Sequence, residues 1–192
     1  LLPFLVARGE WPALRRHWRP LLALSALNAA LPFPLFAYAT GELSAGFASI
    51  LNATAPLFAA LVAAAWLGER LRPVAVAGLA VGFAGVLVLA GDVPALGPGA
   101  VLAVAAGLVA SASYGVSASL AKRYLAGVSP WVTTTGGFGF AAPLLAVPAA
   151  FTWPAQWPGA PAWIAVVLLA IACTTIRKIA YFRLLHRSSP NR

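Results

Sequence analysis

Two asparagine–proline pairs are the residues of this sequence best suited to bind a polar molecule in an apolar setting. Asn28 precedes Pro32 by four residues, and Asn52 precedes Pro56 by the same spacing, each pair near the middle of a long apolar run. Proline has no N–H to donate to the carbonyl four residues back, and its ring pushes that carbonyl away. The carbonyls of Asn28 and Asn52 are therefore expected to be free beside their own amide side chains. Each pair either only kinks its helix or contributes to a solute site, and the repetition favours a site.

Aromatic and hydroxyl side chains extend this candidate site. Thr54 stands within the second pair, and Tyr38 and Tyr114 are expected to form aromatic walls. Ser113 shares a helix face with Ser117 by its four-residue spacing, although a serine in an apolar helix can instead bond a carbonyl of its own preceding turn. The predicted solute path comprises Asn28, Pro32, Tyr38, Asn52, Thr54, Pro56, Ser113 and Tyr114.

The sequence shows no recognisable arrangement of catalytic side chains. Both histidines, His17 and His186, lie in basic segments, and Cys173 is the single cysteine. The sequence has no HExxH, GxSxG or paired intramembrane carboxylates, which would carry metal chemistry or hydrolysis. The acidic residues stand at the ends of apolar runs or in polar turns: Glu10, Glu42, Glu69 and Asp92. We therefore predict no catalytic residue, no metal and no cofactor.

The elements that position the candidate residues are apolar helices. The 192 residues are 61% hydrophobic and 9% charged, and the mean hydropathy is +0.88, whereas soluble domains carry about 25% charged residues. The runs Ala45–Leu67 and Pro73–Gly91 are separated only by Gly-Glu-Arg-Leu-Arg. A bilayer core needs roughly 20 apolar residues as helix. These two runs are therefore predicted to form a transmembrane hairpin.

The whole chain is predicted to be an all-α, polytopic membrane bundle with about six spans. A basic segment, Ala7–Arg19, comes before them and is expected to be a cytoplasmic loop anchored at the interface by Trp11 and Trp18. The spans are Pro20–Ala39, Ala45–Leu67, Pro73–Gly91, Gly99–Ala121, Trp131–Phe151 and a last run from near Pro161 to Ile176.

Basic residues fall only in alternate connections between these spans. All 13 lysines and arginines lie before the first span, in the 68–72 turn, at 122–123 or after 176, whereas the other connections carry Glu42 and Asp92. By the positive-inside rule the basic side is cytoplasmic. The net charge of +9 therefore reflects membrane topology, and we predict that the chain does not bind nucleic acid.

The span Pro73–Gly91 carries a row of glycines. Gly78 and Gly82 form a GxxxG motif, with Gly85 close to one turn further on. Small residues let helices approach closely in a membrane. The row either packs against a neighbouring helix of the same chain, which we favour, or associates with a second copy or a partner subunit.

The segment Ser44–Gly91 resembles the second half of an EamA domain of the drug/metabolite transporter (DMT) superfamily. The matching features are the Asn52-Ala-Thr-Ala-Pro56 centre, the Leu67-Gly-Glu-Arg70 turn and the glycine-rich span that follows. Upstream, PLLALSALNAALPFPLFAYAT resembles the preceding EamA helix, and downstream GAVLAVAAGLVASASYGVSASLAKRYL resembles the start of a second repeat. Arg177 and Lys178 depart from the pattern, because apolar residues are expected there.

The resemblance implies a fold of ten spans in two inverted five-span repeats around a central solute cavity. On this alignment residues 1–91 are the C-terminal part of the first repeat and residues 92–192 the N-terminal part of the second, so the chain is expected to be incomplete at both ends. The implied function is a permease that moves a small organic metabolite or drug by alternating access across a bacterial-type inner (plasma) membrane. The alternatives are a half-transporter that needs a partner subunit and a truncated remnant that inserts without transporting.

The charge alternation gives a testable topology. We expect a cysteine at position 42 in a Cys173→Ser background to react with an impermeant thiol reagent added outside intact cells. A cysteine at position 16, 70 or 122 should react only after the membrane is permeabilised. Labelling at 16 but not at 42 in intact cells would reverse the assignment.

Overall fold

The computed structural model describes residues 8–91, 97–152 and 157–171. In these ranges the chain is helical without a strand, which confirms the predicted all-α class. The chain forms two compact units, Leu1–Pro148 and Ala149–Arg192. All the packing and the sites below belong to the first unit.

Four helical segments of the described residues are long and apolar enough to cross a membrane: Trp18–Glu42, Ala45–Leu67, Gly99–Tyr124 and Pro130–Phe151. In elements they are α3 (Trp18–Ser25), η1 (Ala26–Ala30) and α4 (Pro32–Glu42); α5 (Ala45–Ala53) and α6 (Ala55–Leu67); α8 (Pro98–Tyr124); and α9 (Pro130–Gly139) and α10 (Ala141–Phe151). Three of the four are thus broken into shorter helices, and only α8 runs uninterrupted.

Two further apolar helices correspond to the third and sixth predicted spans. Helix α7 (Pro73–Ala90) has a shorter apolar stretch, Pro73–Val88. Helix α11 (Ala160–Ile171) belongs to the second unit. The predicted end of the sixth span at Ile176, together with Arg177 and Lys178, lies outside the described residues, as do Asp92 and Cys173.

The predicted loop Ala7–Arg19 is wrong in part, because it contains helix α2 (Trp11–Arg16) and the first residues of α3. Pro12 in the first turn of α2 fixes a helical φ at a position where no N–H is needed.

Capping residues also fix the ends of α5 and α6. At the start of α5 the Ser44 side chain accepts a hydrogen bond from the Phe47 N–H (3.2 Å), and Gly68 ends α6 with a φ of 69°.

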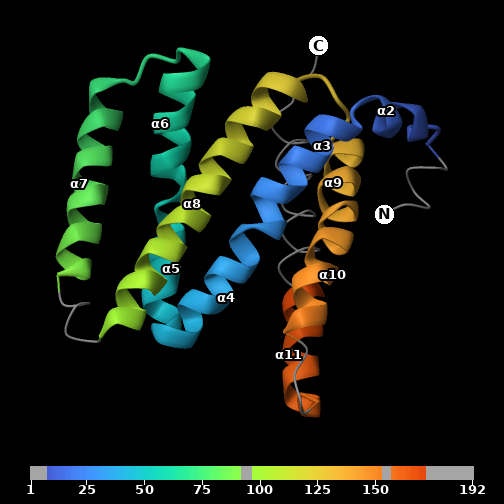
Figure 1. Cartoon of the computed structure of the whole chain (residues 1–192). Coiled ribbons are helices and arrows are strands. Elements are labelled where there is room, and N and C mark those ends of the chain that lie inside the picture. Colours follow the sequence, from blue (N-terminus) through green and yellow to red (C-terminus); the bar gives the residue numbers. More distant parts are fainter. Residues whose placement is uncertain (1–7, 92–96, 153–156, 172–192) are drawn as a thin grey trace. The chain divides into compact units, whose positions relative to one another are not determined.

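Helix α8 is the centre of the first unit and packs against α3, α4, α5 and α6 (Figure 1). Two glycines allow the approach. A Cβ on Gly107 would lie 2.7 Å from Leu51 Cδ1, and a Cβ on Gly115 would lie 2.7 Å from the backbone of Phe58 and Ala59. Since real side chains do not tolerate such distances, α8 and α6 come together only because residue 115 has no side chain.

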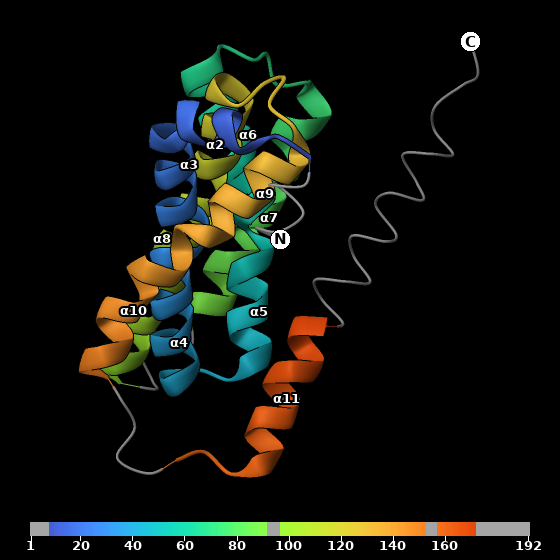
Figure 2. The same ribbon diagram turned by 90° about the vertical axis from the view of Figure 1, so that its right-hand side faces the viewer.

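Helix α9 crosses α3 on another side of the unit (Figure 2). The Ser25 hydroxyl donates to the Gly137 carbonyl over 2.6 Å, and a Cβ on Gly136 would lie 2.8 Å from Leu21 Cδ1. Leu21 and Val132 are both fully buried in this contact. The crossing therefore combines apolar packing with a hydrogen bond that lipid cannot replace.

The predicted glycine row of α7 makes contact at one position. A Cβ on Gly82 would lie 2.6 Å from Leu57 Cδ1 of α6, and the rings of Phe58 and Phe83 meet edge to face at 5.5 Å. Among the described residues, a Cβ on Gly78 or Gly85 would meet nothing within 4 Å. Gly82 therefore packs within the chain, as favoured above.

The basic connections of the first unit lie at one end of its helices (Figure 1). Lys122 at the end of α8 pairs with Glu69 after α6, and the Arg123 guanidinium lies 5.6 Å from the Trp66 ring centroid. Glu42 lies at the opposite end, beside Gly99 at the start of α8. This arrangement agrees with the alternation of charge in the sequence, while the sidedness stays a prediction.

The close approach at Gly115 gives a stability prediction. We expect Gly115→Ala to lower the free energy of unfolding in detergent micelles by about 1–3 kcal/mol, because the methyl group meets backbone atoms that cannot move aside. Gly78→Ala is the matched control on α7, where the added methyl group has space, and it should be neutral or stabilising. Thermal unfolding followed by circular dichroism measures both variants. Equal stability of the two would contradict the packing described here.

Candidate functional site

The second membrane segment is interrupted at Thr54, between α5 and α6. The Leu51 carbonyl accepts the Thr54 N–H at 3.1 Å, the Thr54 hydroxyl at 2.6 Å and the Ser111 hydroxyl of α8 at 2.7 Å. Sequence reasoning expected the free carbonyl at Asn52, four residues before Pro56. The carbonyl that receives these three donors is instead that of Leu51, one residue before Asn52. The reason is that the Thr54 N–H bonds the carbonyl three residues back, as in a turn, and not the one four residues back, as in an α-helix. An interhelical hydrogen bond thus secures the break.

The first membrane segment is interrupted at its own asparagine–proline pair. There the Leu31 N–H donates to the Ala26 carbonyl five residues back (2.9 Å), which makes the π-helical turn η1 around Asn28. Pro32 follows as a fully buried first residue of α4. Turns of this kind open the backbone ladder and are frequent at functional sites. Both predicted pairs therefore stand at discontinuities.

Helix α8 faces both interruptions with serines. Ser117 Oγ lies 3.4 Å from Asn28 Oδ1 and also donates to the Tyr114 carbonyl at 2.8 Å. The Ser111 hydroxyl donates to the Leu51 carbonyl at the second interruption. Ser113 is 5% exposed and donates to the Ala110 carbonyl of its own helix at 2.7 Å. The hydroxyl of Ser113 is thus used locally, which was the alternative to a solute-facing role.

A groove of about 280 Å³ lies where α4, α5 and α8 meet, and we call it the α4–α5 groove. The rings of Phe36 and Tyr114 form one wall, stacked with centroids 6.3 Å apart and planes 20° apart. Asn52 comes from the opposite side, on α5. The complete lining is Phe36, Thr40, Ala45, Ala48, Ser49, Asn52 and Tyr114.

Some polar groups of the α4–α5 groove already make hydrogen bonds within the chain, and others do not. Thr40 donates to the Ala37 carbonyl at 3.0 Å, and Ser49 donates to the Ala45 carbonyl at 2.8 Å. Within the described part of the chain, the Asn52 amide and the Tyr114 hydroxyl make no hydrogen bond. The lining carries no charged side chain. The groove therefore offers an aromatic wall, one amide and one phenol to a ligand.

The structure brings only two of the eight predicted site residues, Asn52 and Tyr114, together in this groove. Thr54 is 3% exposed and borders a different groove, about 390 Å³ in volume, between α5–α6 and α7. Tyr38 is 45% exposed on α4, and Pro56 is also exposed, and neither contributes to the α4–α5 groove. Asn28, Pro32 and Ser113 lie at the contacts described above.

Sequence reasoning missed five lining residues: Phe36, Thr40, Ala45, Ala48 and Ser49. A signal for two of them exists, because Asn28, Pro32, Phe36 and Thr40 follow one another at four-residue steps and so lie along one helix face. Extending the first asparagine–proline pair by this rule would have included them.

The helical fold, with four segments able to cross a membrane, defines a multi-pass membrane protein. The model of the EamA-like transporter family matches residues 1–91 and 101–192, and the chain belongs to that family. It is therefore a membrane transporter of the drug/metabolite type, as the sequence resemblance indicated, and proteins of this family are generally not enzymes. Searches of curated proteins and of solved structures found no match.

The Leu51 carbonyl gives a prediction about the helix break. We expect Ser111→Ala to lower the free energy of unfolding by about 1 kcal/mol, because a buried interhelical hydrogen bond is lost. Ser113→Ala is the matched control, since it removes an equally buried serine that bonds within its own helix. Unfolding by sodium dodecyl sulfate in mixed micelles measures both. A loss no larger for Ser111→Ala than for Ser113→Ala would contradict the role of Ser111.

Proposed function

We propose that the chain provides the solute path of an inner-membrane permease, and that the α4–α5 groove binds the solute. The observation that carries this proposal is the pairing of an unbonded amide, Asn52, with an unbonded phenol, Tyr114, beside an interrupted helix. Polar groups inside a membrane bundle need partners, and transporters commonly place solutes at discontinuous helices. A solute that accepts and donates hydrogen bonds would satisfy both groups.

The lining points to a small uncharged solute with one flat apolar face. A charged solute would lose its hydration and find no countercharge, because none of the lining side chains is ionised. The stacked rings of Phe36 and Tyr114 suit a flat ring system. The volume of about 280 Å³ falls just below the ~300–1,000 Å³ that drug-sized ligands use. Nucleosides meet these requirements better than amino acids or cationic drugs.

Alternating access would use the interruptions of the first two membrane segments, at Asn28 and Thr54. Helix α6 is held against α8 at Gly115, helix α5 packs against α8 around Gly107, and the turn at Thr54 joins α5 to α6. A change of angle at this turn would open or close the α4–α5 groove while the Ser111 bond keeps the turn on α8. We assign residues 1–91 and 92–192 to the two repeats of the transport fold, which the two-part family match supports.

A binding experiment on the purified chain in proteoliposomes tests the site. We expect saturable binding of a tritiated uncharged nucleoside and much weaker binding of a zwitterionic aromatic amino acid or a cationic aromatic dye. Asn52→Leu should weaken nucleoside binding about tenfold, because the amide loses its hydrogen bonds to the solute. Tyr38→Phe is the control, since Tyr38 lies on α4 outside the groove.

Nucleoside affinity unchanged in a correctly inserted Asn52→Leu variant would rule out the groove as the site. A preference for the cationic dye would be compatible with a binding site in the groove but would overturn the proposal that the solute is uncharged. Binding without flux would favour a half-transporter that needs a partner subunit. Flux measured with the chain alone would remove that requirement.

A further inference from the structure

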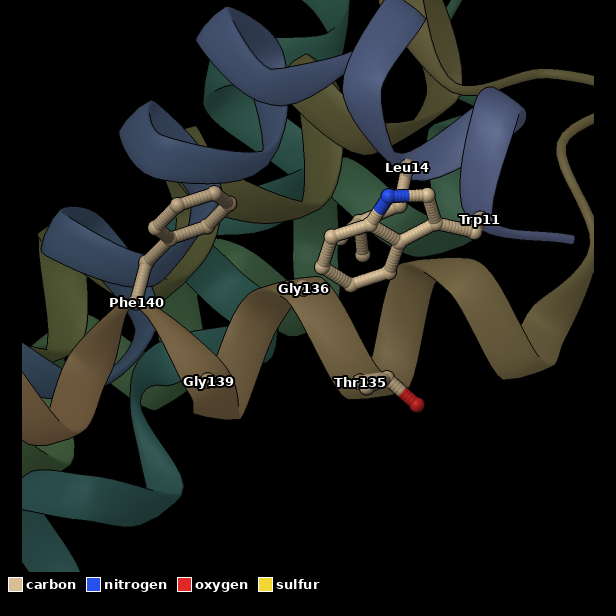
Figure 3. Close-up of a pocket in the computed structure, with 6 residues that line it drawn as sticks. All are labelled: Trp11, Leu14, Thr135, Gly136, Gly139 and Phe140. Carbon is tan, nitrogen blue, oxygen red and sulfur yellow. The ribbon is translucent and has the colours of Figure 1, made fainter. Parts of the chain in front are cut away.

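A second groove lies near the basic end of the first unit, between α2 and the α9–α10 segment, and we call it the α2–α9 groove. It has a volume of about 180 Å³. Figure 3 shows the Trp11 ring lying over the Gly136 turn of α9, with Phe140 further along the segment. Its lining is Trp11, Leu14, Thr135, Gly136, Gly139 and Phe140. The groove takes no part in the proposed solute path.

The position of the groove along α9 matches the upper part of a lipid acyl chain. Helix α9 begins at Pro130, in the connection that follows Lys122 and Arg123. At 1.5 Å per residue, Thr135 and Phe140 lie about 8 and 15 Å along the helix from Pro130. The headgroup layer on each side of a bilayer is about 5–8 Å thick. With Pro130 at the water side of the headgroup layer, the groove lies at the level where acyl chains leave the headgroups.

Two exposed arginines flank the groove on its basic side. The Arg15 guanidinium carbon lies 6.0 Å from the ring centroid of Trp11, which lines the groove. The Arg8 guanidinium carbon lies 4.9 Å from the ring centroid of Trp131, one turn before Thr135 on α9. Glu10 stands between these two arginines in the sequence, and its buried Oε2 has no hydrogen-bond partner among the described residues. One carboxylate therefore faces two cationic side chains. Arginines beside interfacial tryptophans are well placed to bind a phosphate while the rings cover apolar surface.

We propose that the α2–α9 groove binds one anionic phospholipid. Its acyl chain lies along Gly136 and Gly139 between the Trp11 and Phe140 rings, and its phosphate lies between Arg8 and Arg15. The groove is open at Gly139, where an added Cβ would meet no atom of the described residues within 4 Å. Charge complementarity favours an anionic over a zwitterionic headgroup, since the anionic headgroup adds a net attraction to the two arginines.

Native mass spectrometry of the full chain tests the headgroup. The protein is purified in a mild detergent and mixed with equal amounts of dioleoyl phosphatidylglycerol and dioleoyl phosphatidylcholine. We expect one phosphatidylglycerol to be retained in preference. Arg8→Gln combined with Arg15→Gln should lower that preference by roughly fivefold for each arginine. Arg70→Gln combined with Arg72→Gln removes the same charge away from the groove and should leave the preference unchanged.

A second variant tests the acyl-chain groove. Gly139→Leu should displace the retained lipid, because its side chain occupies the open space, while both arginines remain. Gly78→Leu is the matched control, since Gly78 also has open space but lies on α7.

Lipid retention unchanged in Gly139→Leu, or equal losses in the two arginine pairs, would overturn the proposal. A dimer that Gly139→Leu dissociates, without any preference for phosphatidylglycerol, would also overturn it and assign the groove to a second copy of the chain.

Discussion

The helix arrangement depends on how an interrupted helix satisfies its backbone where water is absent. The segment Ala45–Leu67 changes direction at Thr54, and lipid offers no donor for the carbonyls that such a break exposes. The Thr54 hydroxyl supplies one donor to Leu51, and Ser111 of α8 supplies another from a different helix. Because a hydrogen bond needs a distance near 2.7 Å, this requirement fixes the position of α8 on the break.

The same requirement creates the α4–α5 groove. Helix α8 comes this close because Gly115 lies against the backbone of α6, and Gly107 leaves room for the Leu51 side chain. Tyr114, the neighbour of Gly115, is thereby placed against Phe36 of α4 and across from Asn52 of α5. A contact needed for stability therefore also determines which side chains meet at the site. This coupling shows how a helix without a buried charge would contribute to the proposed solute path.

The two grooves differ in the chemistry they offer and in their distance from the basic end of the unit. The α4–α5 groove carries an amide and a phenol but no charge, which suits a solute that must leave the site again. The α2–α9 groove is apolar and has arginines at its rim, near the basic end of the unit. The free-energy cost of placing a charged group in a membrane is small only near the headgroups, where water and phosphate are available.

The sequence by itself determined the all-α membrane class, the helix-forming runs, the interruptions at the two asparagine–proline pairs and the family. These features depend on length, apolar content and proline position, all of which act locally. The tertiary structure alone decided which candidate residues meet. A four-residue spacing puts Ser113 and Ser117 on one face of α8, but it does not say which neighbour that face contacts or whether a hydroxyl turns to its own helix. The close contacts of Gly107 with Leu51 and of Gly115 with Phe58 and Ala59 decide which helices α8 meets. These contacts join residues that are far apart in the sequence.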